Sequence, residues 1–120
     1  MASDYEKLVV WQKSMVLVTE IYKVTQKFPK EEIYGLTGQM RRSAISIPSN
    51  IAEGKGRHTN NEFRQFLVQA RGSLLELETQ VQIAGNLGYL KVQKAEELKA
   101  KTVEIGKMLN GLREALTPDK

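Results

Sequence analysis

Apolar residues recur at helical spacing along nearly the whole chain, with gaps that alternate between three and four positions. No segment shows a convincing alternation of apolar and polar residues, the pattern typical of a half-buried strand. We expect four helices, over about residues 7 or 9 to 27, 30 to 53, 59 to 87 and 91 to 116. Short connections make consecutive helices antiparallel neighbours. The pattern therefore predicts an all-α fold: one up-down-up-down four-helix bundle over residues 1–120.

The expected core follows one face of each helix. In the third and fourth helices it comprises Phe63, Leu67, Ala70, Leu74, Leu77, Val81 and Ala84, and then Ala95, Leu98, Thr102, Ile105, Leu109, Leu112 and Leu116. The first helix carries two apolar stripes: Trp11, Met15, Val18 and Tyr22, and Val10, Leu17, Ile21 and Val24. Phe66, Leu75 and Ile83 lie outside the main stripe of the third helix. Either self-association buries this surplus, or the core is smaller than the pattern suggests.

Glycine and proline mark the expected ends of the first two helices. The first should end at Phe28, because the residue before Pro29 is pushed out of the helical region. Pro29 can begin the next helix. An interruption is expected near Gly35, and Gly54 is the expected cap at the end of the second helix.

Local capping chemistry marks the last two helices as well. Thr59 and Glu62 have the spacing of a reciprocal capping box and should open the third helix. Gly88 can adopt the left-handed conformation that commonly ends a helix. The fourth helix should stop before Pro118.

Pro48 lies in the middle of the second expected helix. A proline there donates no backbone hydrogen bond and crowds the preceding turn, which costs roughly 3 kcal/mol in a helix interior. Ile47 and Ile51 share one face, and nearby polar side chains can bond the disturbed backbone: Ser46, Ser49 and Asn50. We therefore expect a kinked helix that packing holds in place.

Composition sets the broad class of the protein. At 120 residues and 41% hydrophobic content, the chain is long enough for one domain with a real core. It contains no apolar run of the ~18 residues that can span a bilayer, and its first residues show no export signal. We expect a cytoplasmic protein with no membrane association. Because the chain has no cysteine, disulfides and thiolate chemistry are excluded.

The net charge of +4 is concentrated in one segment. Acidic and basic residues balance in residues 1–40 and 72–120, whereas residues 41–71 carry six lysines and arginines against two glutamates. Five of those six bases are arginine, whose planar guanidinium can bond two phosphate oxygens at once. The segment therefore indicates either a phosphate-binding surface or arginines that pair with carboxylates of the same bundle or of a neighbouring subunit.

A succession of short motifs resembles one known family over nearly the whole chain. The motifs are VWQK (10–13), IY (21–22), FP (28–29), YGL (34–36), QMRR (39–42), SIPSNIAEG (46–54), GSLLELE (72–78) and LGYL (87–90). They are similar to the bacterial four-helix-bundle proteins named for 23S ribosomal RNA intervening sequences. The resemblance implies a cytosolic homopentameric barrel. More distant relatives include the accessory variability determinant of diversity-generating retroelements, a basic pentamer that binds nucleic acid and partners a reverse transcriptase.

Two groups of candidate residues follow. The first would bind nucleic acid: Lys55, Arg57, His58, Arg64 and Arg71. Arg57, Arg64 and Arg71 follow one another at intervals of seven residues, so Arg64 and Arg71 should share one stripe of the third helix with Arg57 just before its start. They should form a basic strip about 10 Å long on the helix, near the positive end of its dipole. The second would make structural or inter-subunit ion pairs: Arg41, Arg42, Glu53 and Glu76. No base-reading module is recognisable, so we expect little sequence specificity.

Enzymatic candidates are few. His58 is the single histidine, and with no cysteine or second histidine beside it no metal site is expected. Glu76 and Glu78 point to different faces of a helix and form a poor acid and base pair. Residues 54–57, GKGR, lack the preceding strand and the spacing of a phosphate loop. We expect a protein that is not an enzyme and has no cofactor.

Two functional hypotheses remain. In the first, the protein is an oligomeric accessory protein that binds the backbone of RNA or DNA, for a reverse transcriptase or a ribosomal RNA element. In the second, it is a protein-interaction scaffold whose arginines make inter-subunit ion pairs and which binds no nucleic acid. Substitution of Arg57, Arg64 and Arg71 by glutamine separates the two, because only the first predicts salt-sensitive binding that this change abolishes.

Overall fold

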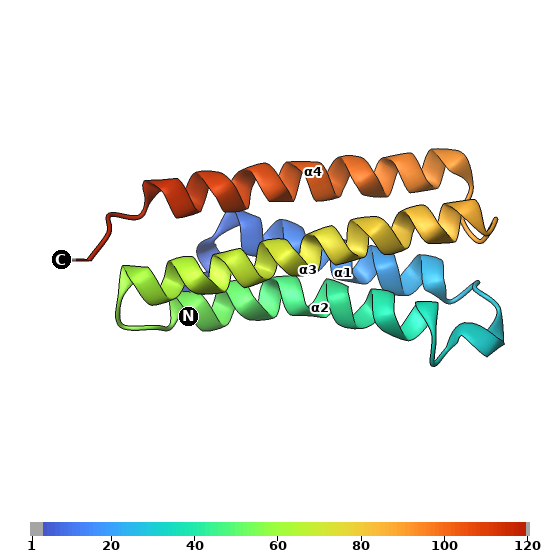
Figure 1. Ribbon diagram of the computed structural model, residues 1–120, viewed down its shortest axis with the longest axis horizontal. Coiled ribbons are helices and arrows are strands. Elements are labelled where there is room, and N and C mark those ends of the chain that lie inside the picture. Colours follow the sequence, from blue (N-terminus) through green and yellow to red (C-terminus); the bar gives the residue numbers. More distant parts are fainter. Residues whose placement is uncertain (1–3, 120) are drawn as a thin grey trace.

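Four antiparallel helices form an elongated bundle of 50 × 24 × 23 Å in the computed structural model, which describes residues 4–119. The elements follow in the order η1 (Asp4–Lys7), α1 (Val9–Thr25), η2 (Lys30–Glu32), α2 (Leu36–Lys55), α3 (Asn60–Asn86) and α4 (Val92–Ala115). Each helix packs on the next one in the chain, and α4 returns to α1 (Figure 1). Residues 4–119 contain no strand. The predicted all-α four-helix bundle is confirmed.

The core of α3 is the face predicted from its spacing. All seven predicted positions, from Phe63 to Ala84, are buried. In α4 the four central positions are buried, namely Leu98, Thr102, Ile105 and Leu109, whereas the predicted positions nearest the helix ends are only half-buried. The contribution of α4 to the core therefore comes from the middle of that helix.

Only one of the two apolar stripes of α1 enters the core. Val10, Leu17 and Ile21 are buried. The other stripe turns toward the outer edge of α2, where Met15 stays 42% exposed and Tyr22 36% exposed. Helix α1 packs against α2 and α4. The stripe that contains Met15 and Tyr22 is not fully covered by these two helices, so it remains partly exposed to solvent.

Pro48 lies inside α2 and is buried, as predicted. Ile47 and Ile51 beside it are fully buried. The side-chain amide of Asn50 donates to the carbonyl oxygen of Ser46 (2.8 Å) and to its hydroxyl (2.9 Å), and that hydroxyl also bonds Ser73 of α3 (2.8 Å). Packing and these bonds hold the helix through its proline, while a kink at Pro48 stays a prediction.

Gly54 does not cap α2, contrary to the prediction. The helix continues to Lys55, and Gly56 takes the cap position with an ordinary φ of −80°. Gly54 is buried instead where α2 crosses α3, and a Cβ at this position would lie 2.5 Å from Cβ of Phe66 and 2.9 Å from Cδ1 of Phe63. Gly54 is therefore required for the close approach of two helices.

The predicted ends of α3 are close to those observed. The Thr59 hydroxyl accepts from the backbone N–H of Glu62 (3.1 Å), as in a capping box, but it also donates to the Glu62 carboxylate (3.2 Å). At the other end Gly88 has φ +80°. The N–H groups of Gly88 and Tyr89 bond the carbonyls of Gly85 (3.1 Å) and Ala84 (2.9 Å), which is a Schellman ending.

Candidate nucleic-acid interface

Four of the five residues predicted to bind nucleic acid lie in or close to the turn between α2 and α3, and the fifth, Arg71, lies near the middle of α3. Lys55 ends α2, Arg57 and His58 lie in the turn, and Arg64 and Arg71 follow on α3. All are exposed except Arg64, which is half-buried. The structure thus brings them to one end of the bundle and the adjoining part of α3, but their partners differ.

Arg57 is paired within its own chain. Its Nη2 donates to Oε2 of Glu53 at 2.8 Å, one turn away, and its guanidinium carbon lies 4.8 Å from the centre of the Phe66 ring. Glu53, one of the residues predicted to make structural or inter-subunit ion pairs, thus has a partner in its own chain, and any pair it makes across a subunit boundary stays a prediction. The side chains are 41% and 57% exposed, so the pair contributes at most about 1 kcal/mol to folding. A phosphate can therefore compete for Arg57 at little cost.

Arg64 holds the end of α4. Its Nη1 donates to the carbonyl oxygen of Leu116 at 2.9 Å, across the gap between α3 and the C-terminal segment. A continuous strip of three free arginines is therefore not present: Arg57 pairs with Glu53, Arg64 bonds Leu116, and of the three only Arg71 has no partner among residues 4–119. The spacing placed Arg64 on the same stripe of α3 as Arg71. At Arg64, however, this stripe lies against the end of α4, and Leu116 takes up the guanidinium.

The N-terminus of α3 is also occupied. The Asp119 carboxylate accepts from the backbone N–H of Asn61 (2.7 Å) and of Asn60 (3.4 Å), and the Asn60 side chain donates to the carbonyl of Thr117 (2.9 Å). A carboxylate at a helix N-terminus complements the helix dipole. The dipole expected to strengthen the basic strip is thus already compensated by the chain's own aspartate.

Lys55, His58 and Arg71 remain available. His58 and Arg71 make no hydrogen bond or ion pair with any residue from 4 to 119. The ammonium of Lys55 lies 5.8 Å from the centre of the Phe63 ring and has no acidic partner in that range. Two exposed basic groups at the α2–α3 turn and one farther along α3 therefore have no neutralising partner among the described residues.

The other predicted ion-pair residues are split between two contacts. Arg41 joins α2 to α1: its Nε donates to the Thr25 hydroxyl (2.9 Å), and its guanidinium lies 4.5 Å from the centre of the Tyr22 ring. Arg42 and Glu76 line one shallow polar groove between α2 and α3, but the described part of the chain shows no ion pair between them. Their pairing across a subunit boundary stays a prediction.

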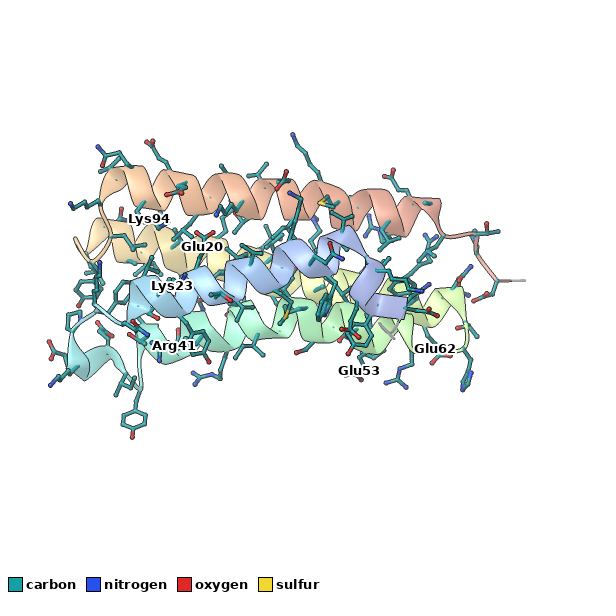
Figure 2. All side chains as sticks on the ribbon, turned by 180° about the vertical axis from the view of Figure 1, so that it is seen from behind. Glu20, Lys23, Arg41, Glu53, Glu62 and Lys94 are labelled. Atoms are coloured by element: carbon teal, nitrogen blue, oxygen red, sulfur yellow. The ribbon has the colours of Figure 1, made fainter. Side chains whose placement is uncertain are left out.

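A second basic cluster was missed by the sequence analysis. Lysines from both ends of the sequence line one hollow between the C-terminal end of α1 and the start of α4: Lys23, Lys27, Lys91 and Lys94. Figure 2 shows Lys23 and Lys94 at one end of the bundle, and Glu53 and Glu62 at the other. We call this site the lysine hollow. Charge counted by segment could not reveal it, because each segment alone is balanced.

The comparisons with known proteins place the chain in a family. The family model for the 23S rRNA-intervening sequence protein matches residues 6–111. The chain belongs to this family. No curated protein matches it significantly. Among solved structures it is similar to a protein of unknown function of the S23 ribosomal protein family from Bacteroides thetaiotaomicron, with 24% identity and a TM-score of 0.80 over 89% of this chain and 100% of that one. At that identity the likeness concerns the fold.

This member of the 23S rRNA-intervening sequence protein family also presents an apolar groove. It runs between α2 and the chain from η1 through α1, and it is lined by Tyr5, Trp11, Met15, Val18, Ile45, Pro48, Ser49 and Ala52. Tyr5 and Trp11 pack edge to face with their ring centres 5.2 Å apart. The second apolar stripe of α1 supplies three of these residues. The apolar residues of this stripe, which the sequence showed in excess of one core, therefore line a surface groove. We call it the α1–α2 groove.

Ion pairs connect α1 and α4 on the side where these two helices pack. Glu20 contacts both Lys101 and Lys94, and Lys13 lies 3.3 Å from Glu104. Burial alone would raise the pKa of Glu20, but the hydrogen bonds and charges of the two lysines outweigh burial and lower the pKa below its ordinary 4.5. Glu20 and Glu104 therefore neutralise part of the lysine charge on this side of the bundle.

The described residues lack both a metal-binding cluster and a membrane-spanning helix. Residues 4–119 hold no group of three or more histidine, aspartate or glutamate side chains placed to bind a metal ion. Within the same residues, no helix combines the length and the hydropathy needed to cross a membrane.

Proposed function

We propose that the protein is a non-catalytic accessory protein that assembles with copies of itself and binds the sugar-phosphate backbone of RNA or DNA. The observation that carries this proposal is the set of exposed basic side chains that have no acidic partner among residues 4–119: Lys55 and His58 at the α2–α3 turn, and Arg71 farther along α3. Basic side chains with no acidic partner gain most from phosphate, because no existing pair is broken and condensed counterions are released.

Self-association is supported by the α1–α2 groove. Its rim includes Met15 and Ile45, both 42% exposed. Burying such residues against a second copy removes apolar surface from water, and a closed ring leaves no copy with an open groove. The resemblance implies a pentamer, which would present the basic residues five times around a ring and add avidity for a long polyanion.

The name of the family, together with the resemblance, supports a ribosomal RNA element or a reverse transcriptase as the partner that this protein serves in the cytoplasm. A ribosomal RNA operon or a reverse-transcriptase gene beside the coding sequence separates these two settings. Contacts to phosphates would fix position without reading bases, so binding should depend little on sequence.

The test uses anisotropy of a labelled RNA hairpin and of a DNA duplex of equal length. The variant Lys55→Gln/Arg71→Gln loses two of the free charges, and Lys13→Gln/Lys107→Gln loses two charges elsewhere. We expect the first variant to reduce the magnitude of the slope of log affinity against log salt by about 2. The control variant should reduce this slope by less. Equal slopes for the two variants would contradict the assignment of Lys55 and Arg71.

The scaffold hypothesis has one observation in its favour. Arg42 and Glu76 share a polar groove without pairing in the described chain, as expected of residues that meet partners on another subunit. If the protein is a scaffold, Arg42→Gln and Glu76→Gln should each lower the mass of the oligomer in light scattering, and wild-type protein should bind neither nucleic acid at about 50 mM salt.

A further inference from the structure

The lysine hollow lies at the end of the bundle away from the α2–α3 turn, and the fold alone creates it. Lys23 and Lys27 come from the end of α1, whereas Lys91 precedes α4 and Lys94 lies in its first turn. More than 60 residues separate the two pairs in sequence. Tyr89 also lines the hollow.

Most of the lysine charge in the hollow is not neutralised. Lys94 lies 3.6 Å from Oε2 of Glu20 and 3.3 Å from Oε2 of Glu97, so its charge is shared. Lys23, Lys27 and Lys91 are exposed and make no ion pair or hydrogen bond with residues 4–119. Three lysines with no acidic partner repel one another, and a bound anion relieves this repulsion.

The carboxylate that bonds Tyr89 of the hollow has a second partner as well. Glu32 accepts from the Tyr89 hydroxyl (3.0 Å) through Oε2 and from the backbone N–H of Leu36 (3.2 Å) through Oε1. The hydrogen bond to Glu32, with burial and the charges of Glu32 and Glu31, raises the pKa of Tyr89. These bonds hold the Glu32 carboxylate on the η2 side of Tyr89, and Glu32 does not line the hollow.

The start of α4 adds backbone donors to the lysines. The residue before the helix is Lys91, which makes no side-chain cap, and the first turn holds no acidic residue. By contrast, Thr59 and Asp119 cap α3. The first N–H groups of α4 therefore lack a side-chain acceptor, and a phosphate oxygen is the acceptor that suits this position beside three ammonium groups.

We propose that the lysine hollow is a second binding site for nucleic-acid phosphates, at the opposite end of the bundle from the predicted site. This inference rests on the proposed function and extends it, since the backbone would contact each subunit at both ends. Lysine ammonium groups bind phosphates as point charges without fixed geometry, so this site adds affinity and salt dependence rather than sequence specificity.

The test compares two triple variants of the full chain that lose equal charge. Lys23→Gln/Lys27→Gln/Lys91→Gln removes the free charges of the hollow, and Lys13→Gln/Lys99→Gln/Lys107→Gln removes three charges from other surfaces. The probe is a labelled RNA duplex of about 20 base pairs, measured by anisotropy at about 50 and 200 mM salt. We expect the hollow variant to bind at least about tenfold more weakly than the control, with a slope lower by about 2 to 3.

A third variant, Lys23→Arg/Lys27→Arg/Lys91→Arg, keeps the positive charge and should bind RNA as tightly as wild type. This result would show that the loss of charge, and not a folding defect, weakens the glutamine variant.

Equal affinities of the hollow variant and the control, with wild-type binding intact, would overturn the second site and leave the proposed function standing. Absence of wild-type binding at about 50 mM salt would overturn both. A loss of thermal stability in the glutamine variant, without weaker binding, would assign the lysines to the C-terminal dipole of α1 and also overturn the site.

Discussion

Gly54 of α2 lies so close to Phe66 of α3 that a methyl group on Gly54 would approach the Phe66 Cβ to 2.5 Å. The Cβ of Phe66 is fixed to the backbone and cannot rotate away, so the two helices would have to separate. This contact packs α2 against α3 at the end of the bundle next to the α2–α3 turn, where Lys55 and His58 lie.

Gly54→Ala should therefore destabilise the protein by about 1 to 3 kcal/mol, the usual cost of overpacking, although alanine favours a helix. Gly72→Ala is the matched control, because it lies in α3 with no atom within 4 Å of an added Cβ. It should stabilise the protein by up to about 1 kcal/mol. Urea unfolding at one fixed protein concentration measures both, and stabilisation by Gly54→Ala would disprove the close contact.

The arginines of α3 should separate stability from binding. Arg64→Gln loses the bond to the Leu116 carbonyl and should lower stability by about 1 kcal/mol, with little change in the salt dependence of RNA binding. Arg71→Gln should leave stability unchanged, because Arg71 has no partner among residues 4–119, and should weaken binding. Thermal melting and anisotropy on the same samples test the pair. The opposite pattern would mean that Arg64 is the ligand.

Glu20 should make stability depend on pH. Its pKa is lower in the folded protein than its ordinary value of 4.5, since Lys101 and Lys94 outweigh the effect of burial. Such a carboxylate contributes stability that is present above the unfolded pKa and lost as pH falls through the folded pKa. Glu20→Gln should thus be less stable than wild type at about pH 7, and the difference should shrink below pH 4.5.

Urea unfolding at about pH 7 and about pH 3 measures this change. The control is Glu114→Gln, because Glu114 is exposed and has no ion pair within residues 4–119. Its difference from wild type should be small at both pH values. A difference for Glu20→Gln that stays constant with pH would contradict the ion-paired state of Glu20.

The α1–α2 groove predicts how the protein self-associates. Ile45→Glu places a charge on its rim and should lower the oligomer mass, because a buried unpaired carboxylate is costly. Val103→Glu changes a residue of similar exposure on α4 and should leave the mass unchanged. Light scattering at matched concentrations measures both masses. If Val103→Glu dissociates the oligomer and Ile45→Glu does not, the interface lies on α4 instead.

Features that depend on neighbours in sequence were predictable. The buried stripe of α3, its cap at Thr59 and the left-handed Gly88 all follow from spacing or from local backbone chemistry. The role of Gly54 was mistaken because glycine near a helix end usually marks a cap, whereas here the deciding atom is on Phe66 of another helix.

The candidate site was less predictable for the same reason. Spacing placed Arg64 and Arg71 on one stripe of α3, but only the packing of α4 shows that Leu116 engages the first of them. The lysine hollow needs the end of α1 and the start of α4 to lie together, and no count of charges along the sequence reports that proximity. The charges counted along the sequence predicted one basic region, within residues 41–71. In the folded protein, lysines from two other segments form a second one, the lysine hollow.

Salt dependence of wild-type binding tests the central claim most directly. A labelled RNA hairpin titrated with the protein at about 50 and 200 mM salt should show saturable binding that weakens by orders of magnitude, as several phosphate contacts require. A DNA duplex of equal length should behave similarly if the backbone is what is recognised. Absence of binding to either probe at about 50 mM salt, or binding that salt does not weaken, would contradict the account.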